Sequence, residues 1–378
     1  MPVIVTKTRA YCNNCEGIHD AELVRSNGNI DGVVYCPDGK YSHRLSSKAE
    51  LYLKLRDKGY CNPASEPPES IRFMLNYMSI TNACNFSCTV CAANACSEED
   101  GNYLDVEEIC ERARGIVDDK RRFLQLFGGE PTIHPELKEI IARLFSLGLR
   151  VGITSNGYLL GKDPQLAVDL KQSGLERVFL QFDSQDKESL DTLKRGYPVE
   201  KKNAIDNVLS SGLDLGLNCI VTKTNLEETP NLLSHGLGYG CQVKNMVFST
   251  AADIGRHAIE SNMCVDRETI VESLLGKHDG YELSLDDISP LPSFSPWRGQ
   301  IHPDCGVHVV FIRTPRKTYP FNQIIDIDKL YSKMSKCSVQ SNGVIAKSAL
   351  PWSSIQIPFW ISWLESYKNI FGPDAYQG

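Results

Sequence analysis

The feature that most restricts the fold is a regular alternation of short apolar runs and amphipathic stretches between residues 71 and 255. Short runs rich in branched and aromatic residues are typical of strands, and the longer stretches between them have the apolar spacing of helices. A strand followed by a helix, repeated about six times, predicts a parallel sheet covered by helices. The predicted strands are 73–80, 123–127, 150–155, 177–182, 215–221 and 243–249, and the predicted helices lie within 106–117, 135–148, 164–174 and 200–212.

Six such units would form an incomplete barrel that is open on one side, and its functional loops would follow the carboxyl ends of the strands. A polar, proline-rich stretch at residues 62–70, NPASEPPES, indicates a linker before it. We therefore expect an α/β protein with a partial (β/α)6 barrel at 71–255. A small metal-binding domain at 1–65 would precede the barrel, and a C-terminal extension at 256–378 would follow it.

Composition excludes several classes of protein. A net charge of −7 argues against a broad surface for nucleic acid or anionic lipid. The N-terminal residues lack the apolar core of a signal peptide, and no run approaches the roughly 18 apolar residues of a membrane span. We therefore expect a cytoplasmic protein, in which the 14 cysteines more often bind metal or do chemistry than form disulfides.

Three of these cysteines crowd into one loop directly after the first predicted strand. Cys84, Cys88 and Cys91 fall within eight residues, so they cannot pair evenly as disulfides. Four thiolates would close a tetrahedral metal site, whereas three leave one position open. An open position on a metal cluster is where a small molecule can bind and react.

A second group of cysteines lies near the N-terminus, around a predicted hairpin with its turn at Asn27-Gly28. Cys12 and Cys15 have the spacing of half a tetrahedral site, and Cys36 is a third ligand by the same argument. Cys61 would complete an all-thiolate set, while His43 or His19 could take its place. Zinc and a single rubredoxin-like iron both suit such a site.

Further motifs follow the next predicted strands in order. FGGEP (127–131) ends the second, SNG (155–157) the third and FDS (182–184) the fourth, with Arg195-Gly196 in the loop beyond. Together with the three-cysteine loop, this order resembles the radical S-adenosylmethionine (SAM) superfamily. The resemblance implies that Cys84, Cys88 and Cys91 hold a [4Fe-4S] cluster. It assigns SAM binding to Gly128, Gly129, Glu130, Pro131, Ser155, Asn156, Asp183 and Arg195.

Other motifs are similar to one branch of that superfamily, which contains the archaeal tetraether lipid synthase and the pterin methylase-like proteins. They include PTIHPELKEII, Gly255-Arg256 and HPDC at 302–305. This branch implies a rubredoxin-like N-terminal domain and an auxiliary iron–sulfur cluster at Cys305. The sequence departs from the branch at 36–39, CPDG, which lacks the usual histidine, and at Val90, which replaces an aromatic residue.

The resemblance implies an enzyme that cleaves SAM reductively to a 5′-deoxyadenosyl radical, which abstracts hydrogen from an unactivated carbon. Carbon–carbon bond formation, methylation or rearrangement of a small soluble substrate would follow. The electron would come from an external donor such as flavodoxin or ferredoxin, and no catalytic side chain is assigned. The alternative is a non-catalytic iron–sulfur electron carrier or metal-stabilised interaction protein, for which the predicted SAM-binding loops would have no use.

Overall fold

The computed structural model describes residues 2–12, 14–58, 76–117, 123–251, 255–288, 307, 309, 311–313, 318–324, 338–339 and 345–346. The chain divides into two compact units. One contains residues 1–71, 266–277 and 281–378, and the other contains residues 72–265 and 278–280. The three-part division expected from the sequence stays a prediction.

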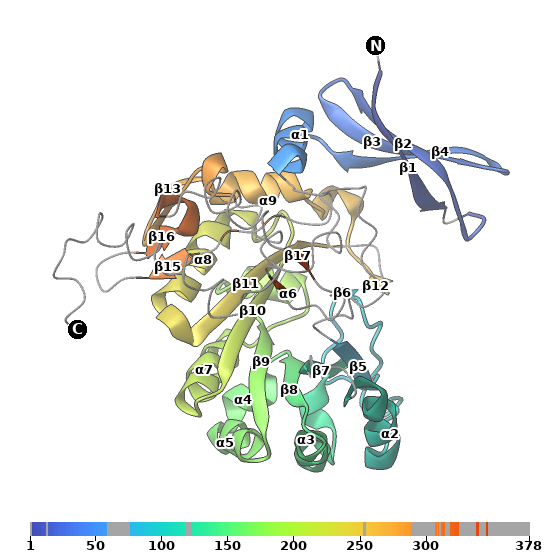
Figure 1. Ribbon diagram of the computed structural model, residues 1–378. Helices are drawn as coiled ribbons and strands as arrows, with labels where there is room; N and C mark the ends of the chain where they lie inside the picture. Colours follow the sequence, from blue (N-terminus) through green and yellow to red (C-terminus); the bar gives the residue numbers. More distant parts are fainter. Residues whose placement is uncertain are drawn as a thin grey trace. The chain divides into compact units, whose positions relative to one another are not determined.

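The second unit is built on six parallel strands in the order β11-β10-β9-β8-β7-β5 (Figure 1). Because this order follows the chain and the edge strands β5 and β11 do not pair with each other, the sheet is an open, partial barrel, as predicted. The six strands are β5 (Asn76–Thr81), β7 (Phe123–Gly128), β8 (Arg150–Ser155), β9 (Leu175–Gln181), β10 (Asp214–Val221) and β11 (Val243–Thr250).

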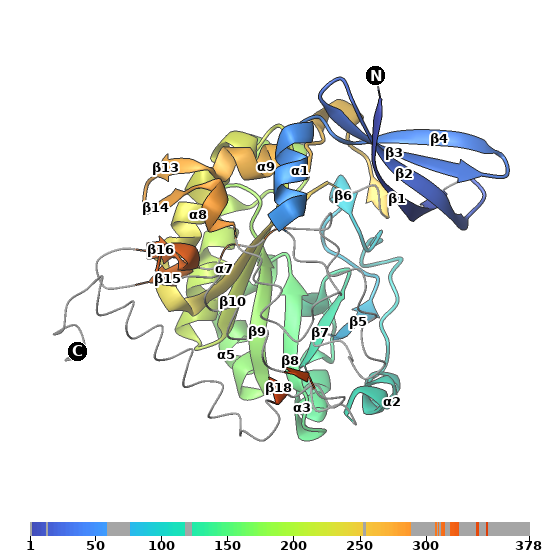
Figure 2. The same cartoon turned by 45° about the horizontal axis from the view of Figure 1, so that its top comes forward.

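Helices connect these strands and cover the outer side of the sheet (Figure 2). Leu126, Ile153 and Leu180 in the central strands have no exposed surface, as expected for a parallel sheet that is buried on both faces. The sequence did not predict α4, α6 and α8, of which α4 and α6 are only five and six residues long. The helices are α2 (Val106–Val117), α3 (Leu137–Ser146), α4 (Tyr158–Lys162), α5 (Pro164–Gln172), α6 (Lys187–Thr192), α7 (Pro198–Ser210) and α8 (Thr229–Gly238).

The first unit begins with a four-stranded antiparallel meander in the order β1-β2-β3-β4. Asn27 and Gly28 have φ values of 49° and 78°, which suit the tight hairpin turn predicted there. A meander places the β1–β2 and β3–β4 turns at the same end of the sheet, and both turns carry cysteines. The strands are β1 (Val3–Cys12), β2 (Gly17–Ser26), β3 (Asn29–Cys36) and β4 (Gly39–Ser46).

Helix α1 (Ala49–Lys58) follows the meander, and its Leu55 packs with Val271 of α9 (Arg267–Leu274) and with Ile288. The short strands are β6 (Val90–Cys91), β12 (Arg256–His257), β13 (Gly276–His278), β14 (Tyr281–Leu283), β15 (Phe311–Arg313), β16 (Thr318–Pro320), β17 (Ser338–Val339) and β18 (Ile345–Ala346). Within the described ranges, every helix is too short or too polar to cross a lipid bilayer.

Candidate active site

The three-cysteine loop follows β5 and is held by backbone hydrogen bonds. Cys84 N–H donates to Cys96 O, and Cys96 N–H donates to Asn82 O, each at 2.9 Å. Burial raises the pKa of Cys84 to about 12, and the negative charges of Glu130, Cys88 and Cys91 add to this effect. Burial and these negative charges therefore disfavour the thiolate form of Cys84.

The sulfur atoms of this loop are spread apart. Among the described residues, Cys12, Cys15 and Cys36 form the one group of three metal-ligand atoms within 4.8 Å of one another. Cys84, Cys88 and Cys91 do not form such a group. Their sulfur atoms are therefore not gathered around a point that a single tetrahedral ion could occupy.

Gly128 and Gly129 pack directly against the backbone that leads from β5 into the three-cysteine loop. A Cβ on Gly128 would lie 1.9 Å from Thr81 O, and a Cβ on Gly129 would lie 1.8 Å from Ala83 O. Gly129 N–H donates to Thr81 O at 2.8 Å. The resemblance assigned SAM binding to these glycines; the structure adds that no larger residue fits at either position.

Glu130 and Pro131 continue this loop, and Pro131 begins a short 3-10 helix. The carboxylate of Glu130 is buried and accepts hydrogen bonds from Thr132 Oγ1 at 2.6 Å, Ser155 Oγ at 2.8 Å and Asn156 N–H at 2.7 Å. Burial raises the pKa of Glu130, although these hydrogen bonds oppose the shift. Glu130 therefore joins the loop after β7 to the loop after β8.

Asn156 makes the next connection. Its Nδ2 donates to Asn85 Oδ1 at 2.7 Å, and Asn85 lies between the first two cysteines of the three-cysteine loop. Ser155 and Asn156 are both buried. The loops after β5, β7 and β8 are thus tied together by side chains that the motifs predicted, with Asn85 as an unpredicted partner.

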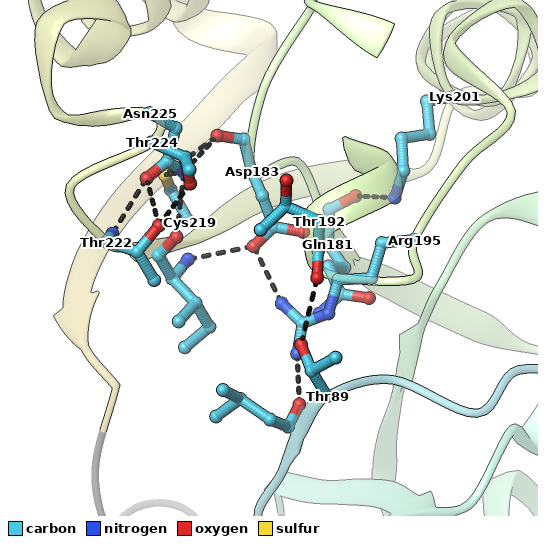
Figure 3. Close-up of polar contacts among 12 residues, drawn as sticks. Thr89, Gln181, Asp183, Thr192, Arg195, Lys201, Cys219, Thr222, Thr224 and Asn225 are labelled. Atoms are coloured by element: carbon cyan, nitrogen blue, oxygen red, sulfur yellow. Dashed lines mark hydrogen bonds and ion pairs between the residues drawn. The ribbon is translucent and has the colours of Figure 1, made fainter. Parts of the chain in front are cut away.

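Asp183 and Arg195 connect the chain beyond β9 to the three-cysteine loop (Figure 3). Arg195 Nη1 donates to Asp183 Oδ1 at 2.9 Å, and Arg195 Nη2 donates to Val90 O, within the three-cysteine loop, at 2.6 Å. Asp183 Oδ1 also accepts from Ile220 N–H at 2.8 Å. Asp183 Oδ2 is buried and has no hydrogen-bond partner among the described residues. The site therefore contains one unused buried acceptor.

Lys201 is a charged residue of this region that the sequence did not reveal. It lies on α7, is 1% exposed, and donates from Nζ to Gln181 O at 3.1 Å (Figure 3). Burial lowers the pKa of Lys201, and the nearby positive charge of Arg195 adds to the shift, whereas the Asp183 carboxylate opposes it. A lysine within an amphipathic helical pattern looks like a surface residue, so no signal in the sequence marked it.

The Gly255-Arg256 pair contacts the three-cysteine loop from β12, which pairs antiparallel with β6. Arg256 Nε donates to Cys88 O at 2.8 Å, and Arg256 Nη1 donates to Ala95 O at 2.7 Å. Gly255 has a φ of 68°, and a Cβ there would lie 2.5 Å from Cys91 O. The pair therefore holds the loop through its backbone carbonyls.

A pocket of about 190 Å³ lies beside the same loop. Three threonines line it: Thr89 of the loop, Thr192 at the end of α6 and Thr222 after β10. Its remaining lining residues are Leu193, Ala258, Ile259, Glu260 and Met263. The pocket offers space for a small group against a mostly apolar lining.

Two predicted metal ligands, Cys61 and Cys305, lie outside the described residues, so both stay predictions. The same holds for the auxiliary cluster at Cys305. The N-terminal group of Cys12, Cys15 and Cys36, by contrast, is assembled as predicted. The structure thus brings together the predicted loop motifs and three of the four predicted N-terminal ligands.

Comparison with protein families confirms the resemblance to radical SAM proteins. Residues 78–235 match the family described as Radical SAM superfamily. This range begins in β5 and ends in α8, so it includes the loops after β5, β7, β8 and β9. The chain is also 24% identical over 367 residues to a 7,8-dihydro-6-hydroxymethylpterin dimethyltransferase of Methanocaldococcus jannaschii, covering 85% of this chain and 71% of that protein.

Other matches cover smaller shares of the chain. A probable GTP 3′,8-cyclase of Methanothermobacter marburgensis is 33% identical over 151 residues, which is 39% of this chain and 48% of the cyclase. Among solved structures, SuiB of Streptococcus suis bound to S-adenosylmethionine matches with a TM-score of 0.44 and 17% identity, covering 50% of this chain and 43% of SuiB. The chain therefore spans only about half the length of these two proteins.

Proposed function

The chain carries a radical SAM domain, and we propose that this domain cleaves SAM reductively and abstracts hydrogen from an unactivated carbon of a small biosynthetic substrate. The observation that supports this most is the way in which four strand-end loops meet. Glu130 joins the loop after β7 to the loop after β8. Asn156 joins the loop after β8 to the three-cysteine loop, and Arg195, beyond β9, also binds that loop. Such connected, buried polar groups fix the geometry of a site before a ligand binds.

In this proposal Cys84, Cys88 and Cys91 hold three irons of a [4Fe-4S] cluster, because thiolates are its usual ligands. When bound, the cluster supplies an electron and an open iron for the amino and carboxylate groups of SAM. An external donor such as flavodoxin or ferredoxin would deliver the electron.

The chain's own residues would orient SAM and exclude water. Asp183 Oδ2 is a buried acceptor without a partner among the described residues, so it can accept a hydrogen bond from a hydroxyl or amino group of SAM. Arg195 and Lys201 place two buried cationic groups nearby, which can balance a carboxylate. Gly128 to Pro131 would present backbone groups to the ligand at the end of β7.

The proposed substrate is a small soluble nitrogen heterocycle, and the proposed outcome is carbon–carbon bond formation or methylation. The names of the relatives support this class, since one refers to a pterin and the other to GTP. The long alignment with the pterin dimethyltransferase also supports carbon transfer.

Anaerobic reconstitution with iron and sulfide tests the proposal. The wild-type protein should bind SAM and release 5′-deoxyadenosine when a strong reductant is added, and the variant C84A/C88A/C91A should release none. C96A is the matched control, because Cys96 lies next to the same loop without belonging to the ligand set, and it should behave as wild type. Continued cleavage by the triple variant would refute the assignment, and a wild-type cluster that never binds SAM would favour an electron carrier.

A further inference from the structure

The antiparallel meander β1–β4 brings together three cysteines that could bind a metal ion, and a fourth ligand for such an ion is not assigned by the grouping. Cys12 ends β1, Cys15 lies in the β1–β2 turn and Cys36 ends β3, and their sulfur atoms lie within 4.8 Å of one another. A tetrahedral ion with metal–sulfur bonds of about 2.3 Å places its sulfurs about 3.8 Å apart. The three sulfurs therefore suit one mononuclear ion.

The β3–β4 turn does not supply the fourth ligand. It reads Cys36-Pro37-Asp38-Gly39, in which Asp38 is exposed and does not belong to the group of ligand atoms. Gly39, which pairs with Cys36 across the hairpin, has no side chain to offer. A fourth ligand must come from another part of the chain.

His43 is poorly placed for this role. Its ring packs over Gly32, with Cε1 and Nε2 each 3.0 Å from the position of a Cβ there. Gly32 and His43 are cross-strand partners, and Gly32 lies four residues before Cys36 on β3. Four strand residues span about 13 Å, which is too far for a bond to the same ion.

His19 lies at the sulfur cluster. It is on β2, and its Nε2 is 2.9 Å from Cys15 Sγ. The ring occupies space that only a glycine at position 17 leaves free, because a Cβ on Gly17 would lie 2.7 Å from Nε2. The imidazole thus already contacts one of the three sulfurs. Its nitrogens do not lie within 4.8 Å of all three sulfurs, so a bond to the shared ion requires the ring to move toward Cys12 and Cys36.

We propose that His19 is the fourth ligand of a mononuclear zinc site with Cys12, Cys15 and Cys36. Three thiolates and one imidazole are a set that structural zinc sites use, and such a closed site leaves no position for a substrate. Zinc has no redox chemistry, so the site links the β1–β2 and β3–β4 turns and does not carry electrons. This inference does not depend on the activity of the barrel.

Elemental analysis and zinc K-edge X-ray absorption of the full-length protein with its iron–sulfur cluster test the proposal, since the zinc edge is separate from that of iron. The expected result is one zinc per chain, with three sulfurs at about 2.3 Å and one nitrogen at about 2.0–2.1 Å. A shell of four sulfurs, or iron in place of zinc, would overturn the proposal. The wild-type spectrum decides the question even if a variant fails to fold.

Variants then identify the ligand. H19A should lose the imidazole signal and release zinc to a competing chelator more readily than wild type, by more than the roughly 100-fold that loss of an outer-shell partner costs. H43A and C61A are matched controls and should keep the wild-type spectrum, whereas H19C should keep its zinc and show four sulfurs. A C61A protein that loses one sulfur would assign the fourth position to Cys61, and an H19A protein that keeps the nitrogen signal would assign it to a histidine other than His19.

Discussion

Arg195 and Asp183 form an ion pair inside the barrel, with 2.9 Å between Nη1 and Oδ1 and with only 4% and 0% of the two side chains exposed. The same guanidinium donates to Val90 O in the three-cysteine loop. The pair therefore fixes the position of that loop and leaves Asp183 Oδ2 as an acceptor. A buried charge that loses its partner is costly, which makes the pair a direct test of the site.

Removal of the Asp183 carboxylate should destabilise the barrel strongly. The D183A variant leaves Arg195 buried and unpaired, and we expect the free energy of unfolding to fall by about 3–5 kcal/mol. Urea titration followed by circular dichroism measures the change. E176A removes the mostly exposed pair between Glu176 and Arg150 and should cost at most about 1 kcal/mol. Equal losses in the two variants would contradict the prediction.

Gly129 should tolerate no side chain. In G129A the new Cβ would meet Ala83 O at 1.8 Å, so β7 or the start of the three-cysteine loop must shift. We expect a protein with less iron after reconstitution and a lower melting temperature. G115A is the matched control on α2, because a Cβ at Gly115 meets no atom within 4 Å. That variant should gain about 0.5–1 kcal/mol from reduced chain entropy and helix propensity, with its iron unchanged.

Arg256 should act as a positioning residue for the cluster. R256A removes two hydrogen bonds from a charged donor to Cys88 O and Ala95 O, each worth about 1.5–3 kcal/mol. We expect less iron and sulfide per chain after reconstitution and faster loss of cluster absorbance in air, with intermediate behaviour in R256K. R112A, which affects only an exposed pair with Glu108, should match wild type. Wild-type cluster retention by R256A would show that β12 positions the loop without the guanidinium.

His134 should make the barrel less stable at acidic pH. Its Nε2 lies 2.9 Å from Leu104 O, and its Nδ1 accepts from Glu136 N–H at 3.2 Å, so the neutral Nε2–H form satisfies both partners. Burial lowers the pKa of His134. Below the unfolded-state pKa of about 6.5, the unfolded chain binds a proton that the folded protein resists, so stability falls as pH falls.

Thermal unfolding between pH 7.5 and pH 5 measures this effect. The wild-type melting temperature should fall more steeply over this range than that of H134Q, whose side chain does not titrate there. Equal slopes in the two proteins would mean that other groups cause the acid sensitivity. The difference in melting temperature between wild type and H134Q at pH 7.5 reports the packing and hydrogen bonds of the imidazole separately.

The sequence alone determined the strand and helix alternation, because apolar periodicity is a local property. The range 150–155 was predicted without error for β8, and 106–117 for α2. Parallel strands joined by helical crossovers have their carboxyl ends at one edge of the sheet, so the order of the motifs also placed Cys84, Glu130 and Asp183 near one another. The turn at Asn27-Gly28 followed from the positive φ that these residues tolerate.

Only the tertiary structure decided which groups meet across long separations. The contacts of Arg256 with the loop that contains Cys88 join residues 168 positions apart, and no local pattern encodes such a distance. Burial of Lys201 depends on how α7 packs on the sheet, because the same helical pattern also suits a surface lysine. For His19 and His43 the sequence left the choice open, since either could reach the cysteines in some register. The observed pairing of β3 with β4 fixed His43 over Gly32 and left His19 beside Cys15.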